Sequence, residues 1–294
     1  MAANAMAALG EPVTRVAASI EASFKVTGGN WQGDEAASQR YKLKLLVGDL
    51  DGAIGEIRTW HRSWLQHFPN AKLSFPISKL AAVYSEAKQD RKAVAIAQMF
   101  VERAPSEDHR FGTIGRMLDV DGVPAALEVM AAAGAIDNVR WQQRLQTWIQ
   151  AAEAKQILEP DARYLWPMGY ARAVHSPAEA SLAVAELDTP PRLPRDMLAT
   201  LSAADVGRAY LLAGKLREAE AWLKRGAADC FVFSHPIKAL RARASLGDFW
   251  AAKGEKDKAC AQYKDVLARW PDPKPGSRTV DKVRSASQAL GCGS

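Results

Sequence analysis

The chain has 294 residues, of which 48% are apolar and 24% charged, and its formal net charge at pH 7 is +6. This composition excludes a chain that is disordered throughout, because there is enough apolar surface to bury a large core. No uncharged apolar run reaches the roughly 18 residues of a membrane-spanning helix, and the first residues lack the pattern of a secretory signal. We therefore expect a soluble, cytoplasmic protein that makes no membrane contact.

The N-terminal third predicts a lead-in followed by two helix pairs. Residues 1–36 show no repeat and are expected to form an N-terminal cap or a disordered segment, whereas residues 37–109 carry repeated helical patterns. In the first pair, Gly48 marks the turn before an overlong second helix. Its apolar positions are Ala53, Ile57 and Trp60. In the second pair, Lys88 replaces the turn glycine, and the matching positions are Leu80, Ala81, Tyr84, Ala93, Ala97, Phe100 and Pro105.

Residues 110–190 are less regular, and we expect degenerate helix pairs there. One helix is indicated by the helical spacing of Trp141, Leu145, Trp148 and Ala152, and another by a cap at Ser176 and Pro177. Residues 187–196 contain three prolines and are the best candidate for a hinge.

The segment from Asp119 to Glu128 resembles a calcium-binding EF-hand loop in part. Asp119, Asp121, Gly122 and Glu128 occupy suitable positions, but Met117 replaces the leading ligand. We expect instead a solvated turn that starts a helix at Pro124.

Residues 200–294 carry the strongest repeat signal, which predicts two helix pairs and a capping helix. The first pair is marked by Gly207, Tyr210, Gly214, Ala219 and Leu223. The second is marked by Leu246, Gly247, Trp250, Gly254, Ala259, Tyr263, Leu267 and Pro271. Here Gly247 is small enough for a close approach of the neighbouring helix, and Gly254 ends the first helix in a left-handed turn. Thr279 is expected to cap the N-terminus of the capping helix, and the apolar stripe of that helix is Val280, Val283, Ala286 and Leu290.

This order of small residue, aromatic, turn glycine, alanine, aromatic and closing proline is the signature of the tetratricopeptide repeat. We therefore predict an all-α, tetratricopeptide-like, right-handed helical solenoid with a C-terminal capping helix. The stretches YLLAGKLREAEAWLKRGAADC, LGDFWAAKGEKDKACAQYKDVLARW and KPGSRTVDKVRSASQALGC also resemble the C-terminal helical region of large bacterial serine/threonine protein kinases. The resemblance covers residues 165–292 well and the part from residue 40 onward more loosely. It implies a sensor or docking module, because in that family the helical tail binds regulators or substrates and a separate domain transfers the phosphoryl group. The kinase motifs themselves are absent from this sequence.

No catalytic or metal site is predicted. The histidines have no neighbouring His or Cys at helical spacing, and they are His61, His67, His109, His175 and His235. The three cysteines are odd in number and widely spaced, which fits neither a disulfide framework nor a zinc site, so we expect small buried or idle thiols at Cys230, Cys260 and Cys292. We expect neither enzyme activity nor a cofactor.

The predicted function is protein or peptide binding in the concave groove of the last two repeats. The residues expected to face a partner are Arg208, Leu211, Arg241, Asp248 and Ala252. The lysines and asparagines with which some relatives clamp a terminal carboxylate are absent at Ala204, Arg208, Ala244 and Asp248, so an acidic or apolar ligand is favoured.

Two alternatives remain. From His235 onward there are twelve Lys or Arg and six Asp or Glu, so this segment carries the whole net charge, and residues 238–284 are a candidate nucleic-acid surface. Against it, the spacing turns Trp222 and Trp250 inward, away from any base. The other alternative is an enzyme built in residues 110–190.

Overall fold

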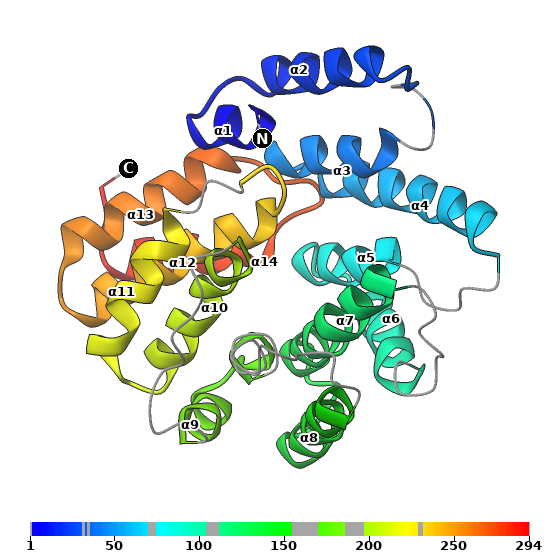
Figure 1. Ribbon diagram of the computed structural model, residues 1–294. Coiled ribbons are helices and arrows are strands. Elements are labelled where there is room, and N and C mark those ends of the chain that lie inside the picture. The colour runs from blue at the N-terminus through cyan, green and yellow to red at the C-terminus, as the bar shows by residue number, and fades with distance from the viewer. Residues whose placement is uncertain are drawn as a thin grey trace. The chain divides into compact units, whose positions relative to one another are not determined.

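The structure is a computed structural model that describes residues 2–30, 33, 36–69, 75–103, 112–154, 170–185, 197–228 and 232–293. Every named element in these ranges is an α-helix, which confirms the prediction of an all-α chain (Figure 1). The expected hinge at residues 187–196, Cys230 and His109 lie outside the described residues. None of the helices that the structure describes is both long and apolar enough to cross a membrane.

The chain divides into two compact units, which are described one at a time. Unit one comprises residues 1–72, 86–88 and 227–294, and unit two comprises residues 73–85 and 89–226. The helices of unit one are α1 (Ala2–Ala8), α2 (Val13–Val26), α3 (Ala37–Leu46), α4 (Leu50–His67), α12 (Pro236–Ala252), α13 (Lys256–Arg269) and α14 (Arg278–Ala289). Those of unit two are α6 (Asp90–Arg103), α7 (Gly112–Ala132), α8 (Asn138–Ala154), α9 (Pro177–Ala185) and α10 (Met197–Leu212). Helices α5 (Phe75–Glu86) and α11 (Leu216–Ala227) also belong to unit two, except for their last residues.

The same left-handed turn follows α3, α5, α7, α10 and α12. In each case it ends one helix and leads directly to the next helix of the chain. After α10, Gly214 has φ +73° and its N–H donates to the carbonyl of Leu211 at 3.0 Å, while Lys215 N–H donates to that of Tyr210 at 2.9 Å. These two bonds satisfy carbonyls that the helix end leaves open. The predicted turns at Gly48, Gly214 and Gly254 are confirmed, and Lys88 adopts the turn at φ 59° without being glycine.

The predicted close approach of paired helices is confirmed where glycine faces a large side chain. A Cβ atom added at Gly247 of α12 would lie 2.4 Å from Cε1 of Tyr263 on α13, so only glycine fits there. Gly207 of α10 is in the same position against Leu223 of α11, at 2.6 Å from its Cγ. Glycine at these places lets the two helix axes come closer than any side chain would allow.

The predicted apolar stripes are largely buried. The buried members are Ala53, Ile57, Leu80, Ala81, Tyr84, Ala93, Ala97, Phe100, Trp141, Leu145, Trp148, Tyr210, Ala219, Leu223, Leu246, Trp250, Ala259, Tyr263, Val280 and Val283. Others are only partly buried, and they are Trp60, Trp222, Leu267, Ala286 and Leu290. The inward position of Trp250 is thereby confirmed, whereas Trp222 keeps part of its surface accessible.

In unit one, the α3–α4 turn packs on the segment that follows α13. The carbonyl of Lys274 accepts from Leu50 N–H at 2.9 Å, and Lys274 N–H donates to the carbonyl of Gly48 at 3.0 Å. Gly48 lies against Trp270 and Pro273, where a side chain would crowd both residues. At the N-terminus, α1 and α2 bury Ala7, Val16 and Ile20 against Val232 and Phe233.

The turn expected before Pro124 is wrong. Helix α7 runs without a break over Gly112–Ala132, with Pro124 inside it, so neither a solvated turn nor a calcium loop is present. A proline inside a helix costs a hydrogen bond. Pro124, Val123 and Leu127 are all buried here, and burying these side chains offsets that loss.

Two expectations for the C-terminal end are also wrong. Cys260 on α13 and Cys292 after α14 are not idle thiols but form a disulfide, with their Cα atoms 5.5 Å apart. Spacing along the chain could not reveal this, because α13 and α14 pack side by side and bring the two cysteines together. The cap of α14 is Ser277 rather than Thr279, and its hydroxyl accepts from Val280 N–H at 3.1 Å.

Candidate functional site

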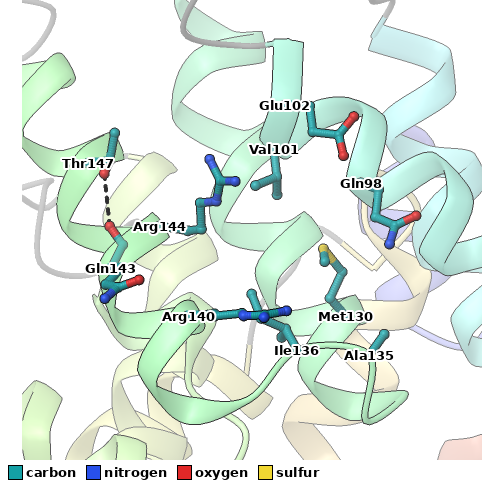
Figure 2. Close-up of a pocket in the computed structure, with 10 residues that line it drawn as sticks. All are labelled: Gln98, Val101, Glu102, Met130, Ala135, Ile136, Arg140, Gln143, Arg144 and Thr147. Carbon is teal, nitrogen blue, oxygen red and sulfur yellow. Dashed lines mark hydrogen bonds between the residues drawn. The ribbon is translucent and has the colours of Figure 1, made fainter.

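A hollow with polar walls lies in unit two, between α6, the end of α7 and α8. It is an open cleft with a volume of about 490 Å³. The residues that line it are Gln98, Val101, Glu102, Met130, Ala135, Ile136, Arg140, Gln143, Arg144 and Thr147 (Figure 2). A cleft of this size matches the usual range for binding sites.

One wall of the cleft is the solvent side of α8, and the sequence determines which residues it presents. Asp137 precedes the helix, and its side chain accepts from Arg140 N–H at 2.8 Å, as an N-terminal cap does. Trp141, Leu145 and Trp148 are buried and define the inner face. Because side chains repeat every 3.6 residues, the polar residues between them are turned outward. They are Arg140, Gln143, Arg144 and Thr147.

The other wall and the floor come from α6 and α7. On α6, Phe100 and Val101 are buried, and the exposed neighbours Gln98 and Glu102 stand on the rim. The floor is apolar, because it is formed by Val101 and Met130, whose side chains are almost fully buried. Figure 2 shows Arg144 reaching from α8 into the space between the helices, with Glu102 and Gln98 on the opposite wall. The cleft thus combines a small apolar floor with polar rims.

Several polar groups of the cleft have no partner within the described part of the chain. The guanidinium group of Arg144 and the carboxylate of Glu102 form no ion pair there, and the amides of Gln98 and Gln143 form no side-chain hydrogen bond. Arg140 is 3.5 Å from Asp137, but the two side chains are 79% and 60% exposed, so this pair is weak. The lining carries two positive charges and one negative charge, and the groups of Arg144 and Glu102 have no ionic partner among the described residues.

The lining contains no cysteine, histidine or serine and only one carboxylate. Over the described ranges, no group of three His, Cys, Asp or Glu is placed to hold a metal ion. The cleft contains hydrogen-bond donors and acceptors, two guanidinium groups and an apolar floor. Groups of these kinds can bind a ligand through hydrogen bonds, ion pairs and apolar contacts.

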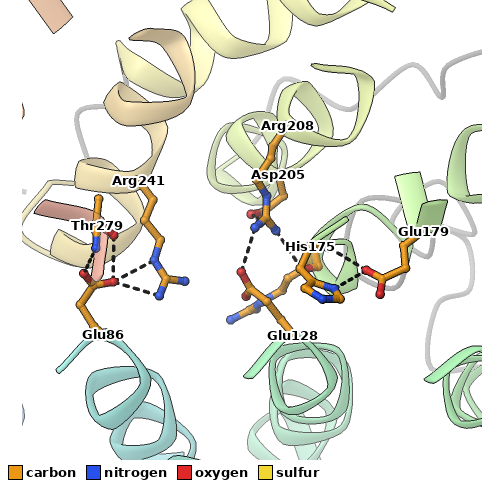
Figure 3. Close-up of polar contacts among 9 residues, drawn as sticks. Glu86, Glu128, His175, Glu179, Asp205, Arg208, Arg241 and Thr279 are labelled. Atoms are coloured by element: carbon orange, nitrogen blue, oxygen red, sulfur yellow. Dashed lines mark hydrogen bonds and ion pairs between the residues drawn. The ribbon is translucent and has the colours of Figure 1, made fainter. Parts of the chain in front are cut away.

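The residues predicted to face a partner are distributed over the two units. Arg208 and Leu211 lie on α10 in unit two. Arg208 is engaged within the unit: its guanidinium donates to Glu128 at 2.9 Å and to the carbonyl of Arg172 at 3.1 Å, as Figure 3 shows in part. The charge of Arg208 is therefore already balanced by Glu128 inside the protein. In the same unit His175 pairs with Glu179, whose side chain is 1% exposed.

The other three predicted residues lie on α12 in unit one. Arg241 contacts the buried carboxylate of Glu86 at 2.9 Å. Asp248 accepts from the hydroxyl of Tyr263 at 2.9 Å and from Lys282 at 2.6 Å. Ala252 is exposed at the end of the helix. Arg241 and Asp248 thus already have partners within the chain, and a role in partner binding stays a prediction.

The basic C-terminal segment is also used internally. Arg243 and Arg269 share the carboxylate of Asp265, at 2.6 and 3.4 Å, and Arg284 donates to the carbonyl of Pro271 at 2.6 Å. Lys88 and Asp281 form a further ion pair. Positive charges that are held by carboxylates are less available to phosphate groups than free ones.

Sequence reasoning missed the cleft because it treated residues 110–190 only as degenerate helix pairs. A signal was present: Arg140 and Arg144 are four residues apart on a helix whose inner face was recognised from Trp141 and Trp148. What the sequence could not show is that α7 packs against both α6 and α8, so that residues of all three helices line one cleft. Comparisons of the chain with protein-family models, with curated proteins and with solved structures found no match.

Proposed function

We propose that the chain is a non-catalytic scaffold that holds a segment of another protein in the cleft between α6 and α8. The observation that carries this proposal is the set of unpartnered polar side chains, above all Arg144, around an apolar floor. A buried or paired arginine can stabilise the fold, but an exposed and unpaired arginine contributes little to the stability of the fold. An open cleft with amide groups on both walls suits the backbone of an extended peptide.

The repeated helix pairs support the same proposal. Paired helices that share a left-handed turn and a glycine contact are the building unit of tetratricopeptide-like solenoids, and such arrays usually bind proteins. We propose this architecture for the chain as a whole. We also propose, from the resemblance of residues 165–292, that it is the sensor or docking region of a bacterial signalling kinase or a freestanding relative of one. The coding sequence upstream of residue 1 tests the kinase proposal, since kinase motifs there would support it and a different kind of domain would contradict it.

Site-specific photo-crosslinking tests the scaffold proposal. The full chain is expressed with p-benzoylphenylalanine at position 143, inside the cleft, or at position 62, on the exposed side of α4 in unit one. Expected are discrete protein adducts from position 143 that are absent from position 62 and are lost when Arg144→Glu is added. Equal adducts from both positions, or adducts that persist in the Arg144→Glu variant, would contradict binding in the cleft.

A further inference from the structure

We infer that the occupant of the α6–α8 cleft is an extended, acidic protein segment with carboxylates at alternate positions. This inference rests on the proposed function and specifies the partner's chemistry. It starts from the two arginines of α8, Arg140 and Arg144, which both line the cleft. Like charges at this spacing repel each other and destabilise a helix slightly, so the pair does not serve the helix itself. Bound carboxylates would relieve the repulsion.

The geometry of α8 determines the spacing of the carboxylates. Four residues of α-helix rise about 6 Å, which separates Arg140 from Arg144 along the helix axis. In an extended segment, two side chains on the same side are two residues and about 6.6 Å apart. An acidic residue, any residue and a second acidic residue therefore match the two guanidinium groups. Adjacent acidic residues would point to opposite sides and meet only one of them.

The other wall determines which way the segment faces. Glu102 on α6 has no cationic partner among the described residues, so it repels a carboxylate on its own side of the cleft. Gln98 and Gln143 stand on opposite walls, where each amide can donate to and accept from a peptide backbone. Acidic side chains are therefore directed to α8, while the backbone lies between the two amides.

A protein segment fits this lining better than a nucleic acid does. Binding of single strands relies on aromatic side chains that stack on the bases, and none of the lining residues is aromatic. A phosphate backbone would also pass the carboxylate of Glu102. The two guanidinium groups suit a few carboxylates, since arginine forms paired hydrogen bonds with a carboxylate.

A defined peptide set tests the inference. Hexapeptides with fluorescein on the N-terminal amine and an amidated C-terminus carry Glu or Gln at positions 2, 3 and 4 in all combinations, with Leu and Gly elsewhere. Their affinities for the full chain are measured by fluorescence anisotropy at 50 mM and 500 mM NaCl. We expect the peptide with Glu-Gln-Glu at positions 2 to 4 to bind about tenfold more tightly than its Gln-Gln-Gln counterpart, and to lose most of this advantage at high salt. A peptide with adjacent Glu residues should bind less tightly.

Variants of the chain locate the effect. Arg140→Gln and Arg144→Gln should each abolish most of the preference for Glu. Arg62→Gln on the exposed side of α4 is the matched control and should leave it unchanged. Thermal unfolding of all three variants should match that of the parent chain, because these side chains are exposed.

The outcomes separate the inference from the proposed function. Equal affinity for Glu and Gln peptides, no binding of any hexapeptide, or a preference that survives both Arg variants would overturn the acidic occupant. Tighter, Arg144-dependent binding of an oligouridine probe would also overturn it. If adducts still formed specifically from position 143 in these cases, the scaffold proposal would stand with a different partner. If neither peptides nor adducts were found, both would fall.

Discussion

The carboxylate of Glu86 is fully buried and lies 2.9 Å from the guanidinium group of Arg241 (Figure 3). It also accepts hydrogen bonds from Thr279, at 2.9 Å from its N–H and 3.0 Å from its hydroxyl, and from the hydroxyl of Ser277 at 2.5 Å. Ser277 is at the same time the cap of α14. One acidic side chain therefore holds both α12 and the start of the terminal helix within unit one.

Replacing Glu86 with Gln should lower the free energy of unfolding by about 3 kcal/mol. The amide keeps the shape but removes the charge that balances Arg241, and it presents a donor to groups that themselves donate. Urea unfolding followed by circular dichroism measures the change. The matched control is Glu21→Gln in α2, whose partner Lys25 is 73% exposed, and it should cost about 0.5 kcal/mol or less. Equal losses for the two variants would contradict the role of Glu86.

The contribution of Glu86 should disappear at low pH. Burial by itself would raise the pKa of this carboxyl, but Arg241 and the hydrogen bonds from Ser277 and Thr279 outweigh burial and hold the pKa below its ordinary value of 4.5. The folded state then binds the proton less readily than the unfolded state does. The stabilisation is fully present above pH 4.5 and is lost as the pH falls through the lower value.

The pH effect is measured as the difference in unfolding free energy between the parent chain and Glu86→Gln. This difference should be constant near pH 7 and shrink steadily below pH 4.5. A difference that stays constant down to pH 3, or grows, would show that the carboxylate charge does not stabilise the fold.

The disulfide between Cys260 and Cys292 should stabilise the C-terminal end. It joins residues 32 positions apart, and closing a loop of that length restricts the unfolded chain by roughly 3 to 4 kcal/mol. Cys292→Ser should lose this amount, and dithiothreitol should destabilise the parent chain but not the variant. Disulfides persist in oxidising compartments and are rare in the reducing cytosol. An oxidised Cys260–Cys292 pair in cells would therefore argue against the expected cytoplasmic location.

The pairing itself is checked by counting thiols. In the Cys230→Ser variant only Cys260 and Cys292 remain, and the unfolded, unreduced protein should contain no thiol that reacts with Ellman's reagent. Two reactive thiols in that variant would show that the bond does not form.

Glycine-to-alanine changes should have opposite signs at two helical positions. Gly247→Ala should destabilise the chain by about 1 to 3 kcal/mol, because the new methyl group would overlap the ring of Tyr263. Gly55 in α4 is exposed and has no heavy atom within 4 Å of an added Cβ, so Gly55→Ala should stabilise by about 0.5 to 1 kcal/mol. Melting temperatures of both variants measure the difference. The same sign for both would contradict the close contact of α12 and α13.

The sequence by itself determined the features that depend on neighbours along the chain. The helical stripes around Tyr84, Tyr210 and Tyr263 and the left-handed turns at Gly214 and Gly254 follow from a period of 3.6 residues and from the conformational freedom of glycine. Even Lys88, which lacks that freedom, was placed at a turn by its spacing alone, and the structure confirms the turn.

Only the tertiary structure decided the features that join distant residues. Glu86 and Thr279 are 193 positions apart, Cys260 and Cys292 lie on different elements, and no local pattern pairs them. Burial also overrode a local rule at Pro124, where the packing of α7 outweighs the cost of a proline in a helix. The cleft belongs to the same class, because Arg144 and Glu102 face one space only when α6 and α8 are assembled. Packing energy depends on which surfaces meet, and a single sequence shows only the residues that each surface carries.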